Sequence, residues 1–191
     1  VTDTGAPLDG AGYNSTMTEV ERMLAASPMR MFTTWNDSSG VRFRDIEHLS
    51  LSASTADARN DLMIVIGDGH HDGAGGTSDT LYADWSDAVT SIAWDNLANA
   101  TVQTVNGSQI SNVERLLLRT GDGDDALRNT NVSTNDDFRT GAGNDTIRAG
   151  AGNDFIDGGA GIDASVYAGP ITEYYVYLNR AARSVQVVDD L

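Results

Sequence analysis

Aspartates recur at a fixed spacing in the C-terminal half of this 191-residue chain. Between residues 120 and 166 the sequence repeats with a period of nine, which the two residues Asn129 and Thr130 interrupt once. The sixth place of all five copies is an aspartate: Asp125, Asp136, Asp145, Asp154 and Asp163. A carboxylate in each of several successive turns favours a hard cation, and Ca²⁺ takes about six to eight oxygen ligands. The spacing therefore predicts calcium-binding turns.

Glycines accompany these aspartates. The second and fourth places are Gly in four of the five copies, whereas the remaining copy has Val132 and Thr134. Glycine tolerates the φ angles at which a turn directs several backbone carbonyls inward, so two stacked turns can supply a complete oxygen shell. We expect two or three calcium ions, with the copy that contains Val132 and Thr134 the weakest. The glycines assigned to these sites are Gly121, Gly123, Gly141, Gly143, Gly150, Gly152, Gly159 and Gly161.

Residues 120–166 resemble the RTX (repeats-in-toxin) nonapeptide Gly-Gly-x-Gly-x-Asp-x-U-x, in which U is a large apolar residue. The resemblance implies a parallel β-roll, in which each nonapeptide forms a calcium-binding turn and a short strand and two nonapeptides form one coil. The eighth-place side chains should then point into the roll, and the ninth-place arginines outward. The eighth-place residues expected to point inward are Leu127, Phe138, Ile147 and Ile156, and the last copy has Ser165 at this place. The arginines are Arg128, Arg139 and Arg148.

The two-copy coil assigns the aspartates to stacked pairs with calcium between the turns. We expect Asp136 to stack with Asp154, and Asp145 with Asp163, whereas the two-residue insertion blurs the register of Asp125 with Asp145. Without calcium the stacked carboxylates repel one another, and the narrow core is too small to offset the chain entropy. Calcium binding and folding should therefore be coupled.

The chain also repeats on a longer scale. Residues 46–51 match residues 113–118, and a weaker echo of the nonapeptide covers residues 60–81. In this degenerate unit His71 stands where an aspartate is expected, and Asp61 and Asp79 are weaker metal candidates. The group formed by Asp68, His70, His71 and Asp72 favours a degenerate turn with two solvent-exposed imidazoles over a transition-metal site, since adjacent side chains of a strand point to opposite faces.

The elements that must hold these turns are mostly short strands. A capping box at Thr16–Glu19 predicts one helix over residues 16–26. Alternating or apolar runs predict strands at 31–35, 41–44, 62–66, 89–94, 101–105, 113–118 and 174–178. We expect an all-β fold with a parallel β-roll, flanking antiparallel hairpin segments and one short N-terminal helix. Its predicted parts are an N-terminal segment at 1–40, the degenerate unit at 41–107, the calcium-binding unit at 108–170 and the start of a third unit at 171–191.

Composition excludes several classes of protein. The net charge is −16, with 28 acidic residues against 12 basic residues, which disfavours nucleic-acid binding. The chain has no Cys, so it has no disulfide scaffold and no thiolate nucleophile. It contains no run of about 20 apolar residues that would cross a membrane. It also lacks Gly-x-Ser-x-Gly, His-Glu-x-x-His and P-loop motifs, so we expect no enzyme activity.

Taken with the resemblance, these features predict a calcium-binding structural module of a larger secreted bacterial protein. The resemblance implies type I secretion, with the chain unfolded at low cytosolic calcium and folded outside the cell. The alternatives are a surface adhesin or polysaccharide-binding segment, which would use exposed Trp and Arg side chains, and a fragment of a secreted enzyme. An exposed Trp row would favour the adhesin. The arginines can equally neutralise neighbouring carboxylates, and the chain is expected to be an excerpt of a longer repetitive protein.

Overall fold

The computed structural model divides the chain into two compact units. Unit 1 comprises residues 1–83 and 99–117, and unit 2 comprises residues 84–98 and 118–191. The four-part division expected from the repeats stays a prediction. The structure describes residues 15–26, 51–52, 60–65, 67–96, 100–130, 133–168, 174–179 and 184–189. The strands expected at 31–35 and 41–44 lie outside these residues.

The first described element of unit 1 is the helix α1, Met17–Ala26, which starts one residue later than predicted. The predicted capping box is confirmed, because the backbone N–H of Glu19 donates to Thr16 Oγ1 at 3.3 Å and the N–H of Thr16 donates to Glu19 Oε2 at 2.7 Å. Thr16 is therefore the N-cap, which is why the helix starts at Met17. Among the described residues, no helix is long and apolar enough to cross a membrane.

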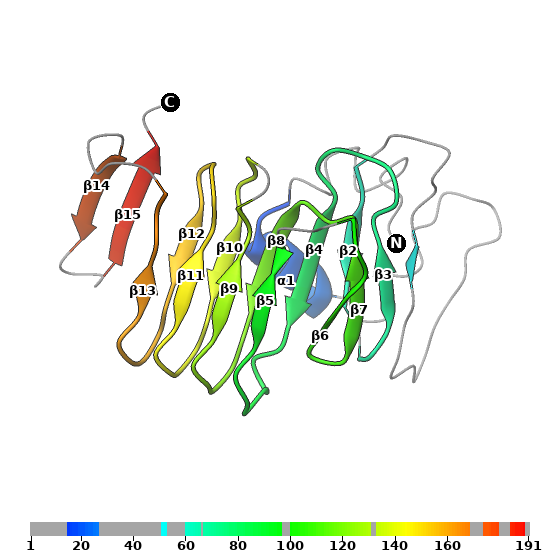
Figure 1. The fold of residues 1–191 in the computed structure, drawn as a ribbon, viewed down its shortest axis with the longest axis horizontal. Helices are drawn as coiled ribbons and strands as arrows, with labels where there is room; N and C mark the ends of the chain where they lie inside the picture. The colour runs from blue at the N-terminus through cyan, green and yellow to red at the C-terminus, as the bar shows by residue number, and fades with distance from the viewer. Residues whose placement is uncertain are drawn as a thin grey trace. The chain divides into compact units, whose positions relative to one another are not determined.

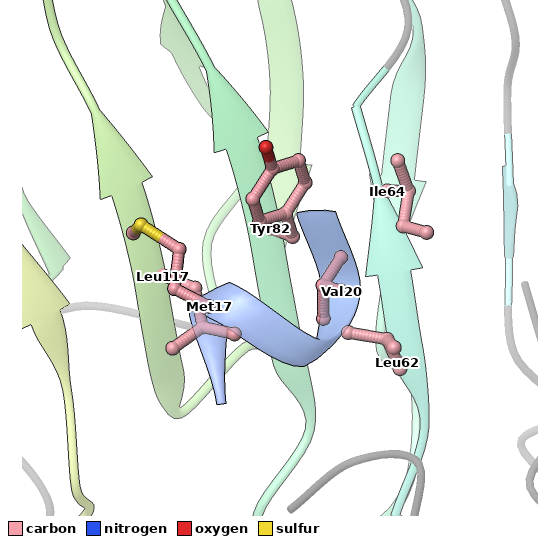
Figure 2. Packing of buried hydrophobic residues seen from close by; sticks show 6 residues of the cluster. All are labelled: Met17, Val20, Leu62, Ile64, Tyr82 and Leu117. Carbon is pink, nitrogen blue, oxygen red and sulfur yellow. The ribbon is translucent and has the colours of Figure 1, made fainter. Parts of the chain in front are cut away.

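The helix supplies part of the apolar core of unit 1. Figure 2 shows Met17 and Val20 of α1 facing side chains of the adjacent strands. All are buried, and burial of a large apolar side chain contributes about 1.5–3 kcal/mol. The strand residues in this core are Leu62, Ile64, Tyr82 and Leu117.

Two sheets contain the strands of unit 1. One has the order β1-β3-β7-β6, in which β6 and β7 form an antiparallel hairpin. This hairpin turns at Asn106 and Gly107, whose φ angles of 43° and 85° fit a type I′ turn. In the other sheet β2, β4 and β8 are successive neighbours. The strands are β1 (Leu51–Ser52), β2 (Leu62–Ile64), β3 (His70–Asp72), β4 (Thr80–Asp84), β6 (Gln103–Val105), β7 (Ser108–Ser111) and β8 (Arg115–Arg119).

Unit 2 contains the nonapeptide repeats, and its chain alternates between two parallel sheets at successive strands (Figure 1). One sheet has the order β13-β11-β9-β5, and in the other β12, β10 and β8 are neighbours. A separate antiparallel pair, β14 and β15, follows. The strands are β5 (Ala93–Asp95), β9 (Ala126–Arg128), β10 (Asp137–Arg139), β11 (Thr146–Arg148), β12 (Phe155–Asp157), β13 (Ala164–Ser165), β14 (Tyr174–Asn179) and β15 (Ser184–Asp189).

The register confirms a coil of two nonapeptides. Phe138 pairs with Ile156, and Thr146 pairs with Ala164, in both cases 18 residues apart. Between β9 and β11 the offset is 20, because the insertion lies between them. The predicted all-β fold with interleaved parallel sheets and one short helix is therefore confirmed.

The interior of the roll is formed by the apolar eighth-place side chains, as predicted, whereas Ser165 at the eighth place of the last copy is exposed. Leu127, Phe138 and Ile147 are buried, and Ile156 is half-buried. The ninth-place Arg148 is exposed, whereas Arg128 and Arg139 are half-buried. Arg139 stacks over the exposed ring of Phe155 at 5.3 Å from the ring centroid. The guanidinium group of Arg139 therefore packs on the outer face of the roll.

The strand predicted at 89–94 is wrong over residues 89–92. Val89 is exposed, and β5 begins only at Ala93. The backbone here bonds to the first nonapeptide turn, since Ala88 O accepts the N–H of Asp122 at 2.7 Å and the N–H of Ile92 donates to Asp125 Oδ1 at 2.7 Å. These groups are thus not available to a strand ladder. The strands predicted at 62–66, 101–105 and 113–118 are displaced or shorter, as β2, β6 and β8.

Candidate metal-binding turns

The sixth-place aspartates stack in two rows. In one row the backbone N–H of Asp125 donates to Asp145 Oδ1 at 2.8 Å, and the N–H of Asp145 donates to Asp163 Oδ1 at 3.0 Å. In the other, the N–H of Asp136 donates to Asp154 Oδ1 at 2.9 Å. The stacked pairs expected from the two-copy coil are confirmed, and the insertion leaves Asp125 directly in register with Asp145. Each carboxylate thus bonds to the turn one coil earlier.

The turn glycines allow the turns to stack closely. Gly143 and Gly161 have φ angles of 134° and 143°, which L side chains rarely adopt. A Cβ on Gly161 would meet the carbonyl oxygen of Gly143, and a Cβ on Gly143 would meet the carbonyl oxygen of Gly123. Backbone carbonyls of one turn therefore lie against the turn one coil later in the same row. Seven of the eight predicted glycines have positive φ, the exception being Gly121.

A second ladder, at the fifth place, escaped the sequence analysis. Asp124 Oδ1 accepts the N–H of Asn144 at 2.7 Å, and Asn144 Oδ1 accepts the N–H of Ile162 at 3.0 Å. Asn135 Oδ1 likewise accepts the N–H of Asn153 at 2.9 Å. The signal was present, because four of the five copies have Asp or Asn at the fifth place. These exposed side chains hold one turn to the next and so fix the spacing of the aspartate row.

Among the sixth-place aspartates, Asp145 has the environment that most clearly favours a bound cation. It is only 1% exposed, and its Oδ2 atom is buried without a hydrogen-bond partner. A buried carboxylate oxygen without a donor is costly, and Ca²⁺ favours such oxygens. Among the described residues no three carboxylate or imidazole side chains converge on one point. An ion beside Asp145 would therefore take most of its oxygens from turn carbonyls, which fits the stacked glycine turns.

Two other sixth-place aspartates already have donors from the chain on both oxygens. Asp125 Oδ1 accepts the N–H of Ile92 at 2.7 Å, and its Oδ2 accepts the hydroxyl of Thr120. Asp136 Oδ1 accepts the Thr134 hydroxyl at 3.2 Å, and its Oδ2 accepts Asn129 Nδ2 at 2.8 Å. Thr134 replaces a turn glycine in the copy expected to be weakest, and it bonds to the carboxylate that an ion would use.

Burial raises the pKa of two of these carboxyl groups. The pKa of Asp154 rises to about 6, against the opposing effect of the Asp136 N–H. The pKa of Asp125 is also raised by burial, against the opposing hydrogen bond from Thr120. Burial disfavours the charged form of each carboxyl, so a bound cation would lower both pKa values.

Unit 1 holds a related ladder of three acidic residues. The N–H of Asp61 donates to Asp79 Oδ1 at 2.7 Å, and the N–H of Asp79 donates to Glu114 Oε2 at 2.8 Å. Burial raises the pKa of Asp79 to about 8, and the negative charges of Glu114 and Asp61 act in the same direction. The structure brings the two weaker metal candidates together and adds Glu114, which the sequence analysis had not singled out. Metal binding at this ladder stays a prediction.

The exposed position expected for His71 is wrong. It lies in β3, is 0% exposed, and neither ring nitrogen has a hydrogen-bond partner. Burial lowers the pKa of His71 to about 4, so the ring is neutral. His70, on the opposite face of the strand, is half-buried. A strand in place of the expected turn points His71 into the interior, where it fills space as an apolar residue would.

Most of the Trp and Arg side chains that an adhesin would use to bind a ligand instead contact other residues of the chain. Trp85 and Trp94 are buried and pack against each other with ring centroids 6.3 Å apart, so neither offers a stacking surface. Arg128 Nη1 lies 3.2 Å from Asp95 Oδ2, and Arg139 makes a two-pronged ion pair with Asp137 at 2.9 Å. These two arginines neutralise neighbouring carboxylates. Trp35 lies outside the described residues.

Comparison with known families identifies the repeated part of unit 2. Residues 131–164 match the family model of the RTX calcium-binding nonapeptide repeat (4 copies). Comparison with curated proteins and with solved structures gave no match. RTX repeats bind Ca²⁺ in a β-roll and are typical of secreted bacterial proteins. The predicted RTX repeats are therefore confirmed, and the chain contains a calcium-binding β-roll module.

Proposed function

We propose that this chain is a structural module of a larger secreted bacterial protein and that unit 2 folds when it binds calcium after export. The observation that carries the proposal is Asp145, a buried carboxylate with one oxygen bonded to the preceding turn and the other without a donor. The family match to residues 131–164 supplies the identity of the cation.

Asp145 and Asp163 would hold one ion between their stacked turns, and Asp136 and Asp154 are the candidates for a second. Bound Ca²⁺ supplies two positive charges and accepts oxygen ligands. The chain's own contribution is positional. The N–H of Asp145 fixes the Asp163 carboxylate at 3.0 Å, and glycine φ angles such as 134° at Gly143 keep the carbonyls of successive turns close together.

The coupling of binding to folding follows from the charges. Aspartates in one row lie one coil apart, about 4.8 Å in a parallel sheet, and like charges at that distance repel. The apolar interior that opposes this repulsion is narrow, because each of the two sheets contributes one row of side chains: Leu127 and Ile147 from one sheet, and Phe138 with half-buried Ile156 from the other. Removal of calcium should therefore release the turns, as in other small domains whose metal-binding energy is folding energy.

We also propose that the module acts without catalysis. A shallow hollow of about 420 Å³ lies over β5, β9 and β11. Its lining includes Arg128 and Arg148 but none of the aspartates whose pKa is raised. Those aspartates lie in the hydrogen-bonded ladders, where they hold neighbouring turns. This arrangement supports a structural role for the buried acids.

The test is calorimetric titration of the full chain with CaCl₂, using Asp145→Asn and the matched control Asp87→Asn. Asp87 is an exposed aspartate outside the repeats. The wild-type chain and D87N should bind the same number of ions, and D145N should lose at least one. Absence of calcium binding to the wild-type chain, or equal binding by D145N, would refute the assignment.

A further inference from the structure

We propose that the first two turns of the roll are stable without calcium and serve as the template on which the calcium-dependent coils assemble. These two turns do not need the ion, because side chains of the protein donate to the carboxylate oxygens that an ion would otherwise bind. The donors are Thr120, Asn129 and Thr134. The inference rests on the function proposed above, since it concerns which turns of the same module need the ion.

In the turn that ends at Asp125, both carboxylate oxygens of Asp125 accept hydrogen bonds from groups of the protein. The hydroxyl of Thr120, which is buried, donates to Asp125 Oδ2, while Oδ1 accepts the N–H of Ile92 at 2.7 Å. The hydroxyl also lies 3.1 Å from the carbonyl oxygen of Thr140, but an ionised carboxylate is the stronger acceptor. Both oxygens of Asp125 therefore have donors.

In the turn that ends at Asp136, both carboxylate oxygens of Asp136 also accept hydrogen bonds, here from other residues. Asn129, which is fully buried, donates its Nδ2 to Asp136 Oδ2 at 2.8 Å and accepts Asn96 Nδ2 on its own Oδ1 at 3.1 Å. Thr134 adds its hydroxyl to Asp136 Oδ1 at 3.2 Å. Asn129 belongs to the two-residue insertion, so the interruption of the repeat supplies the donor that replaces a cation.

The next coil lacks such donors. Asp145 Oδ2 is buried without a partner, although Thr140 stands at the same repeat place as Thr120. The Thr140 hydroxyl lies instead 3.3 Å from the carbonyl oxygen of Gly158. Asp154 and Asp163 each accept one backbone N–H, from Asp136 and Asp145 respectively. The need for an external cation therefore begins at Asp145.

This division sets an order of assembly within unit 2. β9 pairs with β5 through Ala93 and Ala126, and Asn96 and Asn129 tie the ends of the same two strands together. The edge of β9 is thus present before calcium is bound. β11 then adds to β9 and β13 adds to β11, each step placing a carboxylate that calcium must neutralise.

The test is amide hydrogen exchange of the full chain in chelator and in saturating calcium, read strand by strand. In chelator, β9 and β10 should keep their protection, while β11, β12 and β13 should exchange freely. Calcium should restore protection to the last three strands. If β9 and β10 lose protection in chelator together with β11, the template does not exist.

Thr120→Val removes the hydroxyl with little change of shape, and Thr146→Val, on the exposed outer face of β11, is the matched control. In chelator T120V should exchange its β9 amides about tenfold faster or more than the wild-type chain, which corresponds to one charge-assisted hydrogen bond. Calcium should slow that exchange, because Asp125 Oδ2 no longer accepts the Thr120 hydroxyl in this variant and can bind the ion. T146V should leave β9 unchanged. Unaltered exchange of β9 in T120V would overturn the role of Thr120.

The titration of the wild-type chain with CaCl₂ separates this inference from the proposed function. No calcium binding at all refutes the proposed function. Calcium binding with a uniform loss of protection from β9 to β13 in chelator refutes only the template. Calcium binding with protection retained in β9 and β10 supports both.

Discussion

The acidic ladders of the two units use the same backbone bond but differ in what surrounds the carboxylates. Asp61 donates its N–H to a carboxylate 18 residues later at 2.7 Å in unit 1, and Asp145 does so at 3.0 Å in unit 2. In unit 2 glycine turns bring backbone carbonyls against the next coil. In unit 1 a third acid, Glu114, continues the ladder across a longer connection of 35 residues. The ladder itself is therefore common to both units, and unit 2 adds a repeated series of positive-φ glycine turns.

The units also differ in how they tolerate the buried acid. Unit 1 has a wider apolar core, to which α1 adds Met17 and Val20, and the pKa of Asp79 near 8 keeps this carboxyl protonated at neutral pH. A proton there removes one of three neighbouring charges. Unit 2 has only one row of apolar side chains from each of its two sheets inside the roll. The comparison predicts that one unit depends on protons and burial, and the other on calcium.

Calcium removal should have the largest effect and should affect the units unequally. In chelator, β11 and β13 should lose nearly all exchange protection, while β2 and β4 of unit 1 should retain theirs, because burial rather than metal stabilises them. Extracellular calcium modules bind at about 10⁻⁴–10⁻³ M, so the transition should fall near millimolar calcium. Hydrogen exchange across a calcium series measures this. Equal loss in β2 and β11 would remove the distinction between the units.

Substitution of a turn glycine should be the next largest effect. Gly143→Ala places a Cβ against the carbonyl oxygen of Gly123 at a φ of 134°. We expect a loss of at least about 2 kcal/mol in the free energy of unfolding of calcium-saturated unit 2. Urea unfolding followed by Trp fluorescence measures it, because Trp85 and Trp94 lie in unit 2. Gly75→Ala in unit 1, where φ is not positive, is the control, and an equal loss there would contradict the prediction.

The pH dependence of unit 1 tests the role of Asp79. Its folded pKa of about 8 lies above the ordinary value of 3.8, so the folded state binds the proton more tightly. The resulting stability is fully present below about pH 4 and is lost as the pH rises through about 8. We expect unit 1 to lose on the order of 2 kcal/mol between pH 6.5 and pH 8.5, measured as protection of β2 and β4 in chelator after correction for intrinsic exchange rates.

Asp79→Asn should abolish most of this pH dependence, since the amide is neutral at every pH in the range. Asp84→Asn, an exposed aspartate at the end of β4, is the control and should leave the dependence intact. A wild-type unit 1 that is equally stable at both pH values would contradict the proton-based account. The same is true of a pH dependence that survives in D79N.

The smallest effect is expected on the outer face of the roll. Arg128 and Asp95 form an ion pair at 3.2 Å, with side chains 39% and 50% exposed. Exposed pairs contribute about 0–1 kcal/mol, so Arg128→Ala should change the free energy of unfolding of calcium-saturated unit 2 by less than about 0.5 kcal/mol. Added salt should reduce the difference further. Urea unfolding at two salt concentrations measures both, and a large loss would show that outer-face charges, as well as the interior ladder, stabilise the roll.

Local features of the sequence predicted the repeated part well. The capping box at Thr16 and Glu19 depends only on neighbouring residues, and the nine-residue period placed Leu127, Phe138 and Ile147 inside the roll. Predictions failed where distant segments compete for the same backbone groups. Residues 89–92, Val-Thr-Ser-Ile, are rich in the β-branched residues typical of strands, but Ile92 donates its N–H to Asp125, 33 residues away. No pattern within 89–94 carries that information.

The sequence by itself determined the nine-residue period, and its resemblance to the RTX nonapeptide implied the two-copy coil and therefore which aspartates stack. Only the tertiary structure decided which of those aspartates is left without a donor. Asp125 and Asp145 occupy the same repeat place, each with a threonine five residues earlier, yet Thr120 bonds to Asp125 while Asp145 Oδ2 is buried without a partner. The physical reason is that a hydroxyl proton goes to whichever acceptor the packed turn places within reach, and that choice depends on the neighbouring coil rather than on the repeat itself.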